Sequence, residues 1–437
     1  MACINCFFSS ENQREIKVSC FGYERFEEKI YQYKIKYCEA IPRLVPISDC
    51  DCKYNNVIND IHMNWTNDFL QHLQKKISEI SNIFDILYET YLLYISKSYK
   101  HASDYFWNNI QDMKLISYPE NPIFFCRMLF RARVFDSSIE LNNPLEYFHI
   151  PFNKREFIDN QRFSISGQPM LYLSNSIYSI TKELEKNVED LCIGAFLPNY
   201  SIYYYTSKIA EIKNHIFGTL VNSIPGLCAA GSQIKFGYPP NMVPNPNTIV
   251  QDIQRSILSE VLTFPTEDKR KFIGEYVLPQ IFTTLLIEND YKGIIFPSTK
   301  NYNDVMGQHT FSDYNINIAF FTNYEKKNNY DKQLFDSFHI FLMNSRSYDK
   351  LTISAVLDKF TGVTNFHKTY AGEVNNNDYL LPLSTAKLQI EYLEKAVMEG
   401  AKKYFDTEIG KIELFFYSKL SDKMLDLIKQ NIKNSTM

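Results

Sequence analysis

The sequence predicts an α+β protein in which a helical amino-terminal part precedes a mixed domain of strands and helices. Between residues 56 and 115, apolar side chains recur at three- and four-residue steps without any Gly or Pro, which favours long helices. Farther along, short apolar runs bounded by turn residues alternate with helical periodicities, a pattern typical of a mixed fold. A chain of 437 residues is long enough for two or three domains.

Composition and charge narrow the class of protein. Hydrophobic residues make up 45% of the chain and charged residues 22%, which is ordinary for a globular protein. The net charge of -4 gives no electrostatic sign of nucleic acid binding. We find no secretory signal and no apolar run of about 18 residues, so no membrane partner is expected. Because the nine Cys are an odd number, reduced thiols in a cytoplasm are favoured over a disulfide framework.

Changes along the chain predict four parts. A Cys-rich segment covers residues 1–55 and a helical domain residues 56–118. Turn residues around 116–123 then mark a boundary. A mixed domain follows over residues 119–325, and residues 326–437 form an α/β extension.

The cysteines of the Cys-rich segment are spaced like the ligands of a metal site. Cys3-x-x-Cys6 and the later pair Cys50 and Cys52 predict four thiolate ligands for zinc, with Cys20 and Cys38 as alternatives for the second pair. The second pair is Cys-x-Cys, not the commoner Cys-x-x-Cys. The alternative is an irregular segment with buried free thiols.

The prediction of helices between residues 56 and 115 depends on one apolar stripe. Its members are Val57, Ile58, Ile61, Trp65, Phe69, Leu73, Ile77, Ile80, Phe84, Leu87, Tyr91 and Leu92. We expect two or more helices packed along this stripe.

The later elements follow from local pattern. We expect strands at 124–134, 170–173, 294–296 and 316–321, and helices at 176–185, 248–262 and 271–286. Ser174 or Asn175 is the expected cap of the first of these helices. In the extension, 334–342 and 351–363 look like strands and 384–404 like a helix.

Three polar residues stand at nearly equal intervals. Arg162, Tyr172 and Glu183 are ten and eleven residues apart. The planar guanidinium of Arg can donate paired hydrogen bonds to phosphates, and Tyr offers a ring face and a hydroxyl. A carboxylate can stabilise positive charge growing on a sugar. These roles suit a dinucleotide whose glycosidic bond is being broken.

The stretch resembles the RES family over roughly residues 123 to 325. The matching residues are Phe130-Arg131-Ala132-Arg133, Arg162-Phe163 with Gly167, Leu171-Tyr172-Leu173, Glu183 and Pro297-Ser298. Gln161 stands where the family usually has Gly. The resemblance implies a fold related to ADP-ribosyltransferases, with a mixed β core and helices, and an NAD+-destroying toxin of a bacterial toxin–antitoxin system.

The resemblance also implies roles for individual residues. Arg162 holds phosphate or ribose oxygens of the substrate NAD+, with Arg131 or Arg133 beside it. Tyr172 contacts the nicotinamide riboside, Glu183 lies against the reacting ribose, and Ser298 fixes the ribose or phosphate. An antitoxin or immunity protein is the implied partner, and the oligomeric state stays open.

Some larger RES proteins carry a Cys-rich segment followed by a HEPN-like helical domain. HEPN ribonucleases use an Arg-x(4–6)-His pair, which this chain lacks. The helices at 56–118 are then a recognition or dimerisation module, or a plain helical extension.

Other interpretations stay open. Taken alone, Tyr172 fits a core aromatic, Glu183 a solvated helix face, and Ser298 a turn residue; Arg131 and Arg133 fit surface ion pairs. The alternative functions are an ADP-ribosyltransferase acting on a macromolecule and a non-catalytic module that binds RNA or protein. Without paired-His, Gly-x-Gly-x-x-Gly or P-loop motifs, the sequence gives no sign of a catalytic metal, of NAD-dependent redox chemistry or of P-loop nucleotide hydrolysis.

Overall fold

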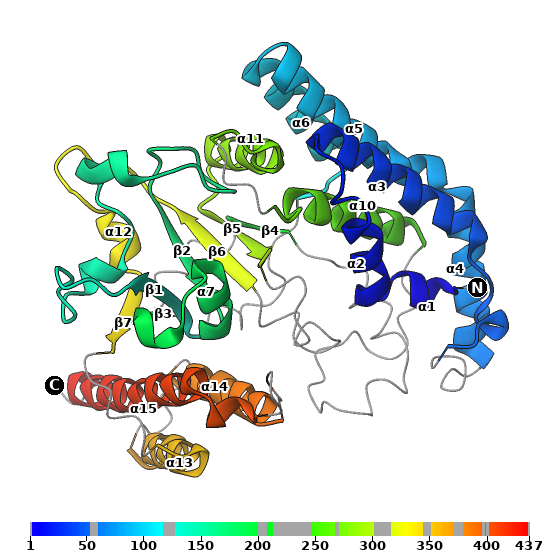
Figure 1. Ribbon diagram of the computed structural model, residues 1–437. Coiled ribbons are helices and arrows are strands. Elements are labelled where there is room, and N and C mark those ends of the chain that lie inside the picture. Colours follow the sequence, from blue (N-terminus) through cyan, green and yellow to red (C-terminus); the bar gives the residue numbers. More distant parts are fainter. Residues whose placement is uncertain are drawn as a thin grey trace. The chain divides into compact units, whose positions relative to one another are not determined.

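The chain folds into helices and strands, in agreement with the predicted α+β class (Figure 1). This computed structural model describes residues 2–52, 60–116, 127–199, 208–212, 246–266, 271–300, 316–343, 351–370, 379–395, 398 and 402–435. Seven strands lie in the described part, and their order in the sheet is β4-β5-β6-β2-β1-β3-β7.

The chain divides into two compact units, each assembled from separate stretches of sequence. The first unit contains residues 1–117, 160–165 and 210–302, and the second contains 118–159, 166–209 and 303–437. The predicted division into four consecutive parts stays a prediction.

The first unit is mostly helical. Its elements are α1 (Ile4–Phe7), α2 (Ser10–Val18), α3 (Phe26–Ala40), α4 (Asp60–Lys75), α5 (Ile77–Ser96), α6 (Tyr99–Asp112), α10 (Pro246–Leu262), α11 (Gly274–Glu288), β5 (Gly293–Pro297) and, except for its first residue, β4 (Ile209–Glu211). The helices predicted between residues 56 and 115 are confirmed as α4, α5 and α6.

The core of this unit is built on aromatic contacts between α3 and α5. The ring of Tyr33 meets Phe84 edge-on with centroids 5.2 Å apart, and Phe26 meets Tyr91 in the same way at 5.4 Å. Such edge-to-face pairs add to the hydrophobic stabilisation of burial. Helices α6, α10 and α11 also pack against α5, so α5 lies at the centre of the unit.

The alternative of an irregular amino-terminal segment is wrong for residues 4–40. Ser9 caps α2 by accepting a hydrogen bond from the backbone N–H of Asn12 at 3.3 Å. In α3, the buried side chains Phe26, Ile30, Tyr33 and Tyr37 recur every three or four residues. This helical periodicity explains why the segment folds as helices.

The second unit contains the larger part of the sheet. Its elements are β1 (Leu129–Val134), β2 (Met170–Ser174), α7 (Ile177–Leu184), β3 (Leu191–Pro198), β6 (Ile316–Phe321), α12 (Lys332–Phe335), β7 (Phe338–Leu342), α13 (Ile353–Tyr370), α14 (Leu381–Leu393) and α15 (Glu408–Ser435). The strand order is β6-β2-β1-β3-β7, and neighbouring strands are antiparallel.

The two faces of β1 and β3 are covered differently. On one face, Phe130, Ile193 and Ala195 belong to a large apolar core shared with α7, α13, α14 and α15. On the other face, the ring of Tyr147 lies so close to Gly194 that an added Cβ would be 3.0 Å from it. Gly194 therefore permits the close approach of the segment around Tyr147.

Several predicted elements are confirmed and others need correction. The strands expected at 170–173, 294–296 and 316–321 are present as β2, β5 and β6. The prediction of a strand at 351–363 is wrong, because α13 covers this stretch and buries Val356, Phe360 and Val363 at helical spacing. The stretch 334–342 is a strand only from Phe338 onward, since Asp331 caps the short helix α12 that precedes it.

The boundaries of two predicted helices also shift. The cap of α7 is Ser176, whose hydroxyl accepts from the backbone N–H of Ser179, and not Ser174 or Asn175. The helix expected at 384–404 is the shorter α14, which ends at Leu393.

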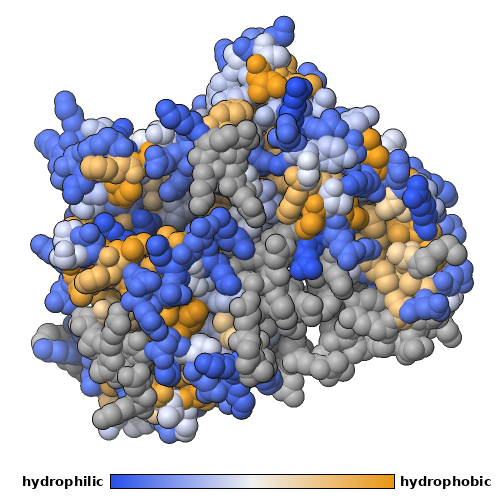
Figure 2. All heavy atoms as spheres, viewed as in Figure 1, coloured by the Kyte–Doolittle hydropathy of each residue, from blue (hydrophilic) through white to orange (hydrophobic). Residues whose placement is uncertain are grey.

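Among the described residues in the view of Figure 2, hydrophilic side chains are widespread and apolar residues gather in patches. Exposed large apolar residues such as Phe135, Phe157 and Tyr324 occur in the described part. Single exposed apolar residues are normal on protein surfaces. In the described part, no helix is long and apolar enough to cross a membrane.

Candidate functional sites

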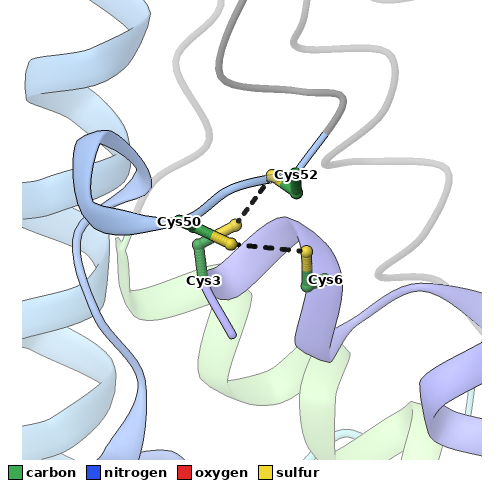
Figure 3. A group of neighbouring side chains, drawn as sticks. All are labelled: Cys3, Cys6, Cys50 and Cys52. Atoms are coloured by element: carbon green, nitrogen blue, oxygen red, sulfur yellow. Dashed lines mark hydrogen bonds between the residues drawn. The ribbon is translucent and has the colours of Figure 1, made fainter. Parts of the chain in front are cut away.

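The four predicted cysteine ligands come together at one point in the first unit. The Sγ atoms of Cys3, Cys6, Cys50 and Cys52 all lie within 4.8 Å of one another, and they point toward a common centre (Figure 3). Sγ of Cys3 is 3.7 Å from that of Cys52, and Sγ of Cys6 is 3.8 Å from that of Cys50. The predicted grouping is confirmed, and the cluster can hold a metal ion.

Local structure explains how two short motifs meet. Cys3 is the N-cap of α1 and Cys6 lies three residues later, so both side chains fall on one side of the helix. Cys50 follows the short 3₁₀ helix Ile47–Asp49 in extended conformation. Residues two apart in an extended chain point the same way, which brings Cys52 beside Cys50. The Cys-x-Cys spacing therefore matches the local backbone.

The thiols of the cluster are partly shielded from solvent. Cys3 and Cys50 are buried, and Cys6 and Cys52 are half-buried. Burial, together with hydrogen bonding and charge at Cys52, raises the pKa of Cys6 to about 12. Bound metal ions reverse such shifts, because a coordinating thiol is deprotonated. Among the described residues, Cys20, Cys38 and Cys192 lie outside the cluster.

Two of the predicted catalytic residues share a face of the sheet in the second unit. Directly opposed residues of paired strands point to the same face. The register opposes Ser174 to both Phe130 and Asn317, so Tyr172, two residues before Ser174, also lies on the face of the apolar core. Helix α7 packs on β1 and β2 and carries Glu183. Nδ2 of Asn317 donates a hydrogen bond to Oε1 of Glu183 at 3.0 Å.

The predicted substrate-binding arginines lie on the opposite face. Arg131 and Arg133 alternate with Phe130 along β1. Nη1 of Arg131 donates to the backbone carbonyl of Tyr172 at 3.2 Å, and burial lowers the pKa of Arg131 to about 10. Arg133 is exposed and forms an ion pair with Glu146 at 2.5 Å. Tyr172 also interacts electrostatically with Arg131, in the direction that raises the pKa of the arginine.

Arg162 and Ser298 belong to the first unit. Arg162 is buried, and its Nη1 donates to the backbone carbonyls of Leu262 and Glu275 at 3.4 and 3.5 Å. Its guanidinium lies 5.0 Å from the ring centroid of Tyr276. These contacts tie the end of α10 to the start of α11. Ser298 directly follows β5 and is buried.

Two residues that contact α7 were not predicted from the sequence. Asn317 is buried and is the single polar residue of β6, a signal that the sequence does contain. Glu413, on α15, is also buried, and its Oε1 accepts from the hydroxyl of Tyr404 at 2.8 Å and from the backbone N–H of Ile177 at 3.3 Å. Residues 236 positions apart make the second contact, so local pattern carries no sign of it.

Comparison of the chain with known protein families, with curated proteins and with solved structures gives no match.

Proposed function

We propose that this chain cleaves the bond between nicotinamide and ribose in NAD+, as a glycohydrolase or a phosphorylase. The observation that carries the proposal is the pairing of Glu183 with Asn317, on the sheet face that also bears Tyr172. These side chains come from β2, α7 and β6. The order and spacing of Tyr172 and Glu183 belong to the pattern that resembles the RES family, and Asn317 lies outside that pattern. An ADP-ribosyltransferase-like arrangement of the sheet is part of the proposal.

Cleavage of the nicotinamide–ribose bond requires that the protein position NAD+ and stabilise the charge that develops. The nicotinamide of NAD+ is already cationic, so no acid is needed to expel it. As the bond breaks, positive charge grows on the ribose, and a fixed carboxylate stabilises it. In our proposal Glu183 is this carboxylate, and the hydrogen bond from Asn317 restricts its orientation. Tyr172 contacts the nicotinamide riboside. Arg131 and Arg133, on the other face of β1, and Arg162 and Ser298, in the first unit, stay predictions for binding NAD+.

The biological role in this proposal is growth arrest by depletion of NAD+ in the bacterial cytoplasm. An antitoxin or immunity protein would then restrain the chain. This role rests on the same resemblance as the activity and stands or falls with it.

Incubating the purified full chain with NAD+ tests the activity. Chromatography should detect free nicotinamide together with ADP-ribose, or with ADP-ribose 1-phosphate when inorganic phosphate is present. Label from NAD+ appearing on a macromolecule would instead indicate an ADP-ribosyltransferase. Unchanged NAD+ would favour a non-catalytic module that binds RNA or protein.

We also propose that the cluster formed by Cys3, Cys6, Cys50 and Cys52 binds one Zn²⁺. In a tetrahedral site with Zn–S distances of about 2.3 Å, the sulfur atoms are about 3.8 Å apart. Two pairs in the cluster are at 3.7 and 3.8 Å, and all four sulfur atoms lie within 4.8 Å of one another, which supports a mononuclear tetrahedral ion. Four soft thiolate ligands favour zinc over harder cations.

Elemental analysis tests the metal. Protein purified without chelator should carry about one zinc per chain. Replacing zinc by Co²⁺ should give the intense visible absorption of a tetrahedral thiolate site. Protein that holds no metal under reducing conditions, or iron in place of zinc, would contradict this assignment.

A further inference from the structure

The junction between the two segments that carry the four cysteines is built mainly from the cysteines themselves. Cys3, Ile47 and Cys50 form a small apolar cluster of their own, with Cys6, Val45 and Cys52 packed around it. Four of these six residues are the cysteines themselves, so the cysteines are the main part of this cluster. A backbone hydrogen bond from the N–H of Val45 to the carbonyl of Ala2, at 3.1 Å, also joins the two segments.

Helix α1 cannot supply its own stability. It has only four residues, whereas isolated helices below about 12 residues are marginal in water. Two aromatic side chains place it against the rest of the first unit: the ring of Phe7 meets Tyr37 at 5.2 Å, and that of Phe8 stacks near Phe69 at 6.5 Å. These contacts hold the end of α1, while at its start Cys3 lies in the cysteine cluster beside Cys50 and Cys52.

We infer that the metal at the four-cysteine cluster is a structural clamp, and that the docking of residues 2–9 and 44–52 in the first unit depends on it. The inference rests on the proposed binding of zinc. Four protein ligands fill a tetrahedral ion and leave no open position for a substrate, which is the mark of structural sites. The ligand pairs are 49 and 44 residues apart, so one ion closes a loop that contains α2 and α3.

Closing that loop restricts the unfolded chain, as other long-range cross-links do. Removing the ion leaves four thiols that attract one another far less. Residues 2–9 and 44–52 should then exchange with solvent while α5, at the centre of the unit, stays folded. Availability of the metal thus controls the order of one edge of the first unit.

Hydrogen exchange of the full chain under reducing conditions tests the clamp. Removal of zinc by a chelator should speed exchange in residues 2–9 and 44–52 by about tenfold or more, because local opening becomes cheaper. Peptides from residues 80–91 of α5 should not change, and added Zn²⁺ should restore the slow exchange. Cys50→Ser should behave like chelated protein without any chelator.

Cys38→Ser is the matched control, because Cys38 is a half-buried free thiol of the same unit outside the cluster. It should keep the zinc and the slow exchange.

If zinc is removed and hydrogen exchange in both segments stays the same, the proposed clamp is contradicted, whereas the proposed binding of zinc is not. Faster exchange in residues 80–91 as well would contradict a local clamp. A chain that never holds zinc would overturn both proposals. If Cys50→Ser does not fold, chelation and reloading of the unsubstituted chain decide.

Discussion

At the scale of single residues, Glu183 is held by its neighbour more firmly than a solvated helix residue. It is half-buried, and the amide of Asn317 fixes one of its carboxylate oxygens at 3.0 Å. Two positions on, Glu185 is exposed and adopts a left-handed backbone conformation at the end of α7, with a φ of 52°. The two carboxylates therefore differ in surroundings although they are close in sequence.

This difference makes the pair a matched test of the proposed catalytic carboxylate. Glu183→Gln keeps the volume of the side chain and removes its charge, so NAD+ cleavage should fall about a hundredfold while the fold is kept. Glu185→Gln should have little effect on the rate. Steady-state rates and a circular dichroism spectrum of each variant provide the measurement. Equal losses in the two variants would show that Glu183 is the wrong assignment.

Arg162 has a structural role in the contacts that the first unit shows. Its guanidinium donates to two backbone carbonyls and stacks on Tyr276. Arg162→Lys keeps the charge but loses the planar fork and the stacking, so the free energy of unfolding should fall by about 1–2 kcal/mol. Thermal unfolding of the Arg162→Lys variant measures this loss. The Arg43→Lys variant, changed at an exposed position of the same unit, is the control. Unchanged stability with a raised KM for NAD+ would instead favour binding of substrate.

At the scale of elements, the sequence predicted best where periodicity is local and apolar. The strands β2, β5 and β6 and the helices α4, α5 and α6 follow directly from such patterns. The stretch 351–363, which belongs to helix α13, was expected as a strand. Its helical character rests on the spacing of Val356, Phe360 and Val363, which pack against α15 far along the chain. Tertiary packing of this kind overrides local propensity.

The cysteine site was predictable from its sequence, whereas Asn317 and Glu413 were not predicted. Spacing alone grouped Cys3, Cys6, Cys50 and Cys52, since metal ligands come as short paired motifs. The partner of Glu183 depends instead on which strand lies beside β2, and that neighbour comes from 134 residues away. The polar Asn317 within an apolar strand is visible in the sequence, but no local pattern shows that long-range strand pairing brings it to Glu183.

Helix α7 is held at its amino end by a carboxyl group from α15. Glu413 accepts from Ile177 and Tyr404, and burial raises the pKa of Glu413 to about 7, above its ordinary value of about 4.3. The folded chain therefore keeps a proton that the unfolded chain releases. The stability due to this group is complete below about pH 4.3 and is lost as the pH rises through about 7.

Glu413→Gln keeps an oxygen for both hydrogen bonds and cannot ionise. The unsubstituted chain should lose about 3 kcal/mol more than this variant between about pH 4 and pH 8, which follows from the raised pKa. Denaturant unfolding at the two pH values gives the difference. Asp426→Asn, at an exposed position of the same helix, should keep the full dependence. An identical pH dependence in Glu413→Gln would show that another group is responsible.

At the scale of the whole molecule, the residues that the resemblance groups together are distributed over both units. Tyr172, Glu183, Arg131 and Arg133 belong to the second unit, whereas Arg162 and Ser298 belong to the first. Both units are built from interleaved stretches of sequence, so neither corresponds to a consecutive segment of the chain. The full chain is therefore the proper material for tests of activity.

Expression of the full chain in a bacterium tests the proposed toxin. Cellular NAD+ should fall before growth stops, because each molecule destroys substrate catalytically. Glu183→Gln, expressed to the same soluble level, should leave both NAD+ and growth close to the uninduced control, since the charge that stabilises the ribosyl cation is gone. Extracts sampled through induction, assayed for NAD+ beside culture density, separate cause from consequence. Growth arrest with NAD+ at control levels, or equal toxicity of the Glu183→Gln chain, would mean that the chain acts by some other route than NAD+ cleavage.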